Sequence, residues 1–204
     1  MNCLKKIFTL SFLLVLTVSC SKKFDTPTFD ERLIPSPSYE STFEKCSRYD
    51  RIYTGLSAVA FLNITYQSLE FRKAYIKELS RLKMLSLQEQ KELIDVNIKE
   101  DSEYFTFILR VYTAKNEWND FHKGDSIWKI TLSNNRKEII EPNTIEVLKE
   151  KPMLNFFYPD INRWVRVYLI AFKKDEHPTF MEDISSINIS ISSFLARTSF
   201  TWTL

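Results

Sequence analysis

Leu56-Ser-Ala-Val-Ala-Phe-Leu-Asn-Ile-Thr-Tyr66 is the stretch of sequence that points most directly to the fold. Every second residue from Leu56 to Tyr66 is apolar, and this two-residue period is typical of a strand with one buried face. Val59 and Phe61 occupy the other face, so we expect partial cover there as well. The sequence therefore predicts a β-strand over 56–66.

Directly after this strand the period changes to that of a helix. Apolar residues recur at helical spacing over 69–85: Phe71, Tyr75, Leu79 and Leu82. Ser68 is suited to cap the start of this helix. A second helix begins at Ser86, because Ser86-Leu-Gln-Glu89 fits the capping box, in which the two side chains satisfy free backbone amides. Its inward-facing residues are expected to be Leu87, Ile94 and Ile98. The two segments predict a helical hairpin at about 68–102.

From Tyr104 the two-residue period returns and recurs through most of the remaining chain. Further strands are expected near 104–113, 127–132, 139–140, 144–148, 164–172, 185–193 and 198–204. Many short strands separated by turn signals are typical of an antiparallel two-layer β-sandwich. We therefore expect a mainly β domain over 39–204, immunoglobulin-like in architecture, into which the helical hairpin is inserted.

The first twenty residues have the organisation of an export signal. Lys5 and Lys6 form a basic start, an apolar run follows from Ile7 to Val18, and a small residue precedes Cys20. The ending Leu16-Thr-Val-Ser-Cys20 resembles the lipobox of bacterial lipoproteins, although Thr17 stands where that family prefers leucine. The resemblance implies cleavage after residue 19 and lipidation of Cys20. Because Ser21 rather than aspartate follows, it also implies transfer to the outer membrane.

An ordinary secretory signal is the alternative interpretation of 1–19. A spanning helix is excluded, since the apolar run rises only about 1.5 Å per residue and is too short for the roughly 30 Å of hydrocarbon. Residues 20–38 carry Pro27, Pro35 and Pro37, which predicts a semi-extended tether between lipid and domain. Alternatively, the apolar residues of this segment pack against the domain edge.

Charge and glycine content exclude several functions. The only charged residues before Cys20 are Lys5 and Lys6, so the chain from Cys20 onward has 26 basic and 26 acidic residues. A neutral chain is not expected to bind nucleic acid. The chain has two glycines, which leaves no phosphate-cradling loop or dinucleotide fingerprint. No cofactor is therefore expected.

Candidate catalytic and metal-binding groups are few. His122 and His177 lie far apart in the sequence, and no His or Cys pair has metal-ligand spacing. Cys46 would be the lone thiol after lipidation of Cys20, and we expect it to be a small buried residue. We expect no enzyme activity and no metal site. A hydrolase site that assembles only in three dimensions is the remaining catalytic alternative.

The best candidate binding site is an aromatic loop over 155–163. Phe157 and Tyr158 lie in it and Trp164 follows, and such rings can stack on sugars or anchor a partner. The alternative is that they plug an open end of the sandwich. The chain is thus expected to be a non-catalytic lipoprotein of the bacterial envelope, held to the membrane through Cys20, with an envelope protein or glycan as partner. A carbohydrate- or peptide-binding module is the alternative.

Overall fold

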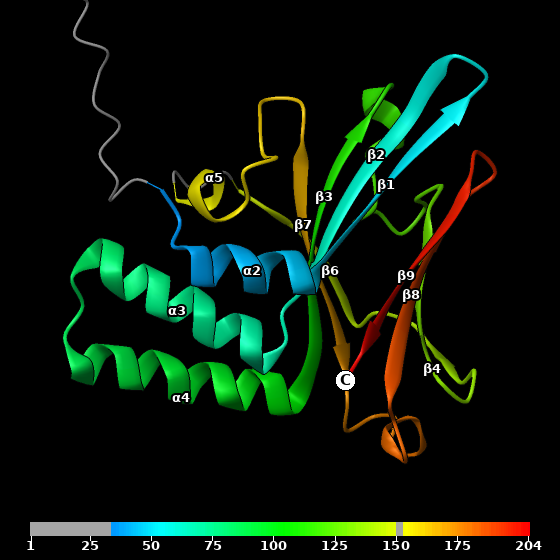
Figure 1. Ribbon diagram of the computed structural model, residues 1–204. Helices are drawn as coiled ribbons and strands as arrows, with labels where there is room; N and C mark the ends of the chain where they lie inside the picture. The colour runs from blue at the N-terminus through cyan, green and yellow to red at the C-terminus, as the bar shows by residue number, and fades with distance from the viewer. Residues whose placement is uncertain (1–33, 150–152) are drawn as a thin grey trace, which may run out of the picture. The chain divides into compact units, whose positions relative to one another are not determined.

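β2 (Ser57–Tyr66) forms where the alternating stretch predicts a strand, and it pairs with a strand on either side. The structure, a computed structural model, describes residues 34–149 and 153–204. In these residues the strands form two antiparallel sheets (Figure 1). The five-stranded sheet has the order β1 (Ser47–Thr54), β2, β3 (Tyr104–Thr113), β7 (Arg166–Lys173), β6 (Thr144–Leu148). The four-stranded sheet has the order β5 (Ile139–Ile140), β4 (Lys129–Asn134), β8 (Ser186–Ser192), β9 (Arg197–Thr203).

The main hydrophobic core lies between the two sheets. From the five-stranded sheet, Leu62 and Leu109 are fully buried, and Leu132 and Ile189 meet them from the four-stranded sheet. Burying a side chain of this size contributes about 1.5–3 kcal/mol. The alternation that predicts these strands therefore also identifies the residues that join the sheets.

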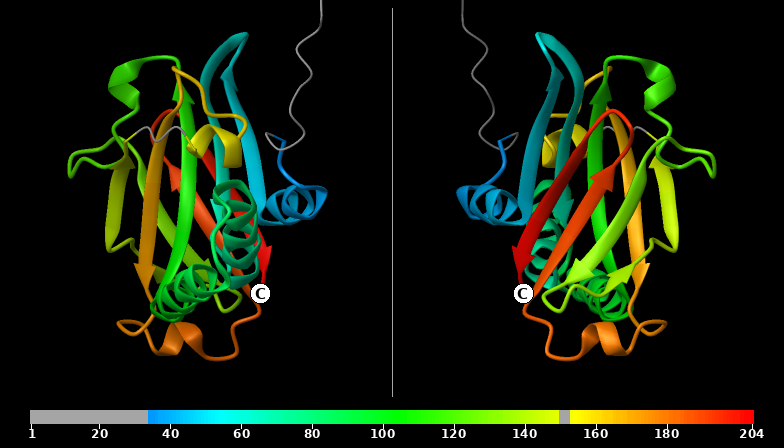
Figure 2. Two further views of the ribbon diagram at one scale, coloured as in Figure 1. Left: turned by 90° about the vertical axis from the view of Figure 1, so that its left-hand side faces the viewer. Right: turned by 90° about the vertical axis from the view of Figure 1, so that its right-hand side faces the viewer.

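β1 and β9, the edge strands of the two sheets, lie side by side (Figure 2). Arg48 Nε donates a hydrogen bond to the Thr201 carbonyl at 3.2 Å, and Thr198 Oγ1 donates to Asp50 at 2.6 Å. These contacts hold one edge of the molecule closed.

Four α-helices are present among the described residues: α2 (Pro37–Cys46), α3 (Leu69–Lys83), α4 (Leu87–Glu103) and α5 (Leu154–Phe157). The predicted caps are confirmed: the Ser68 side chain accepts from Phe71 N, and Ser86 and Glu89 form the reciprocal capping box. α3 and α4 form the predicted helical hairpin. The helices lie on the outer side of the five-stranded sheet (Figure 1).

A second hydrophobic cluster joins the helices to the sheet. Its buried members are Tyr39, Cys46, Phe71, Ile108, Phe157, Tyr158 and Val167. Tyr39 Oη donates to the Phe157 carbonyl at 2.8 Å, which ties α2 to α5. The outer face of the sheet is therefore partly a buried surface.

The prediction of a mainly β fold is wrong in its proportions, because the described chain contains almost as much helix as strand. The structure is a mixed fold of two antiparallel sheets and helices. α2 is not predicted from the sequence, because Pro35 before the helix and Pro37 at its start both indicate extended chain. Pro37 stands at the first position of the helix, where proline's missing N–H costs no hydrogen bond.

The predicted inward face of α4 is wrong. Leu87 is 86% exposed and Ile98 is 42% exposed, whereas Ile94, the third residue predicted to face inward, is half-buried, and the helix has no fully buried residue. α4 instead contacts α3 through polar groups: the buried guanidinium of Arg72 donates to Asn97 and Glu100, each at 3.1 Å. The periodic apolar residues of α4 therefore do not pack into a hydrophobic core.

The predicted signal over 1–19 and the lipidation residue Cys20 lie outside the described residues. Most of the predicted tether, 20–38, does so as well, and its last residues cap and begin α2. In the described part of the chain, no helix is both long and apolar enough to cross a bilayer.

Candidate functional site

One end of the outer face of the five-stranded sheet carries partly exposed aromatic rings. On β3, Ile108 and Arg110 are buried beneath the helices, whereas Tyr112, two residues further along the strand, is partly exposed. On β2 the same change occurs from buried Thr65 to Asn63 and Phe61. Asn63 is paired with buried Arg110, so the cover ends one residue pair earlier on β2 than on β3, and both strands are partly exposed at the Phe61–Tyr112 pair.

Strand register brings the exposed rings together. Phe61 is opposite Tyr112 in the β2–β3 pair and opposite Arg51 in the β1–β2 pair, so all three side chains share the outer face. The ring centres of Phe61 and Tyr112 are 5.3 Å apart, and those of Tyr53 and Phe61 are 5.8 Å apart. The three rings form a continuous aromatic row across β1, β2 and β3.

The segment 158–165 borders this row and is fixed to the sheet by a buried arginine. Arg110 Nε lies 2.9 and 3.0 Å from the two carboxylate oxygens of Asp160. Asp160 also accepts a hydrogen bond from Asn63 Nδ2 at 2.6 Å. Charge-assisted bonds of this kind are shorter and stronger than neutral ones. Asp160 therefore holds the segment at a set position beside β2.

Trp164 projects from this segment and is 65% exposed. Its backbone N–H donates to Asn162 Oδ1 at 2.9 Å, and Val165 N donates to the Asn162 carbonyl at 3.0 Å. The Arg163 guanidinium lies 4.6 Å from the centre of the Trp164 ring. A local turn thus supports the large exposed ring.

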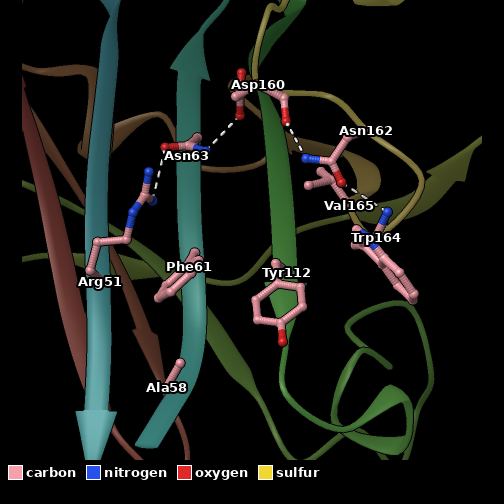
Figure 3. A pocket seen from close by; sticks show the side chains of 9 residues that line it. All are labelled: Arg51, Ala58, Phe61, Asn63, Tyr112, Asp160, Asn162, Trp164 and Val165. Atoms are coloured by element: carbon pink, nitrogen blue, oxygen red, sulfur yellow. Dashed lines mark hydrogen bonds between the residues drawn. The ribbon is translucent and has the colours of Figure 1, made fainter. Parts of the chain in front are cut away.

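Between the segment and the aromatic row is a cavity of about 450 Å³ (Figure 3). Phe61, Tyr112 and Trp164 provide its aromatic walls, and Arg51, Asn63 and Asp160 provide its principal polar groups. A second cavity of about 350 Å³ also has Trp164 in its lining, together with Arg163 and Arg166. Small-molecule sites occupy about 300–1,000 Å³ and combine apolar walls with a few polar groups. The larger cavity fits that description, whereas the smaller one has the volume but a more polar lining.

No known protein-family model matches the chain, and no curated protein matches it at a significant level. The roles of the site residues therefore follow from their geometry alone.

The three aromatic residues of the predicted binding loop have different positions. Phe157 and Tyr158 are 0% and 2% exposed and belong to the second hydrophobic cluster, as the plug interpretation expects. Trp164 is exposed and lines both cavities. Sequence reasoning did not find Arg51, Asn63 or Tyr112. Phe61 gave a signal, because a large ring on the otherwise polar face of a strand requires either cover or a partner.

Other candidate reactive groups are separate from this site. Cys46 is 4% exposed, burial raises the pKa of its thiol, and its sulfur lies 3.6 Å from Ser68 Oγ. Neither His122 nor His177 makes a side-chain hydrogen bond within residues 34–149 and 153–204. Those residues also contain no group of three His, Cys, Asp or Glu side chains that could hold a metal ion.

A cavity of about 570 Å³ lies beside Cys46, and Lys45, Glu70 and Trp202 are among its lining residues. Lys45 and Glu70 pair with each other at 2.5 Å. Trp202 Nε1 donates to the Cys46 carbonyl at 2.8 Å. Because these groups already have partners, the aromatic cavities at Trp164 are the better candidate site.

Proposed function

We propose that this chain is a lipid-anchored, non-catalytic binding protein of the bacterial cell envelope, which recognises a glycan at the cavities beside Trp164. The observation that carries the binding role is the exposed Trp164 ring facing a cavity walled by Phe61 and Tyr112. Without a ligand, a ring this exposed leaves a large apolar surface in water.

The chemistry of the site suits a sugar better than a fully apolar ligand. Sugar rings present C–H groups on their faces and hydroxyls at their edges. The aromatic faces of Tyr112 and Trp164 can contact the C–H groups. Asn63 and Asn162 supply amide groups for the hydroxyls at the same cavity. Two adjoining cavities that share Trp164 give room for more than one sugar unit.

The anchoring part of the proposal rests on residues 1–20. A basic start, an apolar run and the small residue before Cys20 support export, and the lipobox resemblance supports acylation of Cys20. Two or more acyl chains give stable attachment, because each buried methylene contributes about 0.8 kcal/mol. Ser21 supports an outer-membrane location.

The finer architecture that we propose for the domain is an immunoglobulin-like β-sandwich with added helices. Two antiparallel sheets that share one core support it. In this arrangement the helices cover only part of one outer face, and the glycan site occupies the part that they leave open.

Glycan binding is tested with the full chain on an immobilised glycan array, and then by calorimetric titration of the glycans that bind. Trp164→Ala is expected to reduce affinity by about 5- to 150-fold, since a buried aromatic contact of this size is worth about 1–3 kcal/mol. The matched control is Phe194→Ala, because Phe194 is a 77% exposed aromatic between β8 and β9. If Trp164→Ala and Phe194→Ala bound the glycan equally well, the proposed site at Trp164 would be wrong. If a co-purifying envelope protein binds through Trp164 and no glycan does, protein replaces sugar as the ligand.

Anchoring is tested by replacing the sulfur. Cys20→Ser is expected to move the protein from the membrane fraction to the soluble fraction, and the intact mass of the wild-type protein should include acyl groups. Cys46→Ser is the control, because Cys46 is buried in the domain. A Cys20→Ser protein that still sediments with membranes, or a wild-type mass without acyl groups, contradicts the proposal.

A further inference from the structure

The cavities beside Trp164 are surrounded by positive charge. Three arginines line them: Arg51 in the larger cavity, and Arg163 and Arg166 in the smaller one. Among the described residues, Asp160 is the one carboxylate that lines either cavity. The balance of charged side chains at the site is therefore positive, although the chain from Cys20 onward is neutral.

Asp160 does not offset these arginines, because its charge is already matched. Both of its oxygens accept from Nε of Arg110, which is 1% exposed and does not line the cavity. Asn63 donates to the same carboxylate. Asp160 is therefore the counter-ion of a buried arginine rather than of the arginines that line the cavities.

Arg51 is held in place without a carboxylate partner among the described residues. Its guanidinium lies 5.0 Å from the ring centre of Phe61 and 5.8 Å from that of Tyr49, and it donates to Asn63 Oδ1 at 3.3 Å. The adjacent carboxylate, Asp50, instead accepts from Thr198 Oγ1 on β9. The Arg51 guanidinium also donates to the Asp50 backbone carbonyl at 3.4 Å. These contacts orient the arginine, and its other N–H groups are left for a ligand (Figure 3).

We infer that the site selects a glycan with carboxylated sugar rings, such as a uronic acid, and that Arg51 pairs with a ring carboxylate while Tyr112 and Trp164 contact the sugar. This inference rests on the proposed function and names its ligand class. An arginine fork matches a planar carboxylate with two parallel hydrogen bonds. Tyr112 and Trp164 would bind the face of the sugar ring, and Arg51, which has no carboxylate partner among the described residues, would bind its carboxylate.

A single-stranded nucleic acid is the other polyanion that aromatic rings and arginines can bind. Its backbone would require phosphate contacts along a basic groove. The described arginines instead line two cavities that share Trp164, in a chain whose remaining charge is balanced. The geometry thus favours a ligand with few charges beside a ring.

The test uses the full chain on an array of matched sugar pairs: oligomers of glucuronate and glucose, of galacturonate and galactose, and glycans with and without terminal sialic acid. The acidic member of at least one pair is expected to bind about tenfold tighter or more than its neutral partner, because hydrogen bonds between charged groups are the stronger ones. The preference should shrink when NaCl is raised from about 50 to about 500 mM. Methyl-esterified oligogalacturonate, in which the charge alone is removed, repeats the comparison.

Arg51→Gln is expected to abolish the preference for the acidic member, because it should weaken acidic binding about tenfold more than neutral binding. Trp164→Ala should weaken both. Lys91→Gln on exposed α4 removes the same charge at a distance and should change neither. Unchanged circular dichroism of each variant ensures that binding, and not folding, is compared.

The other possible results distinguish failure of the inferred acidic-sugar preference from failure of the proposed glycan site. Equal or better binding of neutral sugars, with loss in Trp164→Ala, overturns the inference but leaves the proposed glycan site in place. Absence of Trp164-dependent binding to every glycan removes the proposed site and the inference with it. Tighter Trp164-dependent binding to oligothymidylate than to any acidic glycan overturns the inference in favour of nucleic acid.

Discussion

Arg110 shows at the scale of one residue how the site is connected to the core. Besides Asp160, it donates to Thr65 Oγ1 at 2.9 Å and to the Ile108 carbonyl at 3.3 Å, and its guanidinium lies 4.8 Å from the centre of the Tyr158 ring. A buried arginine with these partners requires a negative partner of its own. The segment that presents Trp164 is fixed by that requirement.

Asp160→Asn is therefore expected to lower the free energy of unfolding by about 1–3 kcal/mol, because it leaves the buried guanidinium of Arg110 without its counter-ion. Urea denaturation measures the change. Asp175→Asn is the control, since Asp175 pairs with Lys173 at 3.5 Å on the surface, where such pairs contribute little. Equal effects of the two substitutions would show that the Arg110–Asp160 pair has no special role.

Thr106 presents the opposite situation, a buried polar group without a partner. Its side chain is 2% exposed, and among the described residues its hydroxyl makes no hydrogen bond. Thr106→Val keeps the shape and removes the unpaired hydroxyl, so it should raise the free energy of unfolding by about 1 kcal/mol.

Thr113→Val is the matched substitution on the same strand. The Thr113 hydroxyl donates to the Lys115 carbonyl at 2.9 Å and the residue is 5% exposed, so this change should lower stability by about 1 kcal/mol. Thermal unfolding of both variants measures the two effects. Shifts of the same sign would contradict the assignment of Thr106 as unpaired.

At the scale of elements, α2 is fastened to α3 through a buried carboxylate. Glu78 accepts from the Ser36 backbone N–H at 3.1 Å and from the Ser36 hydroxyl at 2.7 Å, and Arg81 donates to it from the next turn. Burial by itself would raise the pKa of Glu78, but the hydrogen bonds from Arg81 and Ser36 outweigh it and lower the pKa. Folding therefore favours the ionised form.

Because the pKa of Glu78 is lower in the folded than in the unfolded chain, its contribution is present above the ordinary value near 4.5 and is lost as pH falls through the folded pKa. Glu78→Gln should cost about 1–2 kcal/mol at pH 7 and less at pH 3. Urea denaturation at both pH values measures this difference. Glu44→Gln, on the exposed side of α2, is the matched control and should change stability by less than about 0.5 kcal/mol at pH 7. A constant cost of Glu78→Gln across pH would contradict the linkage.

The elements that were predicted from the sequence are those whose signals are local. The caps at Ser68 and Ser86 are formed by neighbouring residues, and the alternation in β3 reports burial on one face. The start of α2 has local signals in Ser36, whose side chain caps the helix, and in Pro37, but it is also held by Glu78, 42 residues away, which local sequence does not reveal. α4 was predicted as a helix, but its exposed apolar residues could not be foreseen from their period.

The site required information that a single strand does not contain. Arg51, Phe61 and Tyr112 are adjacent only because three strands pair in one register. Phe157 and Tyr158 are buried because α2 and α3 cover them, which sequence spacing does not reveal. Trp164 is predicted on the same ground as Phe157 and Tyr158, as an aromatic residue at the loop, and it is the one of the three that is exposed, at a position set by the turn at Asn162.

At the scale of the whole molecule, Trp202 connects the two sheets and α2, elements whose sequence signals are independent of one another. Its ring lies 5.3 Å from Phe107 and 6.1 Å from Tyr66 across the core, and its indole N–H donates to the Cys46 carbonyl at the junction of α2 and β1. The last strand of the four-stranded sheet thus contacts both the five-stranded sheet and the first described helix. This arrangement links the closing of the core to the positions of the helices.

Trp202→Phe separates these two roles, because phenylalanine keeps an aromatic ring but has no donor for the Cys46 carbonyl. The expected loss is about 1–3 kcal/mol, from a buried carbonyl left without its partner and a small loss of packing. Urea denaturation followed by far-UV circular dichroism measures it. Trp164→Phe is the control: its ring is exposed, so the same substitution there should change stability by less than about 0.5 kcal/mol. If Trp202→Phe were equally neutral, the hydrogen bond between β9 and the α2–β1 junction would not contribute to the stability of the fold.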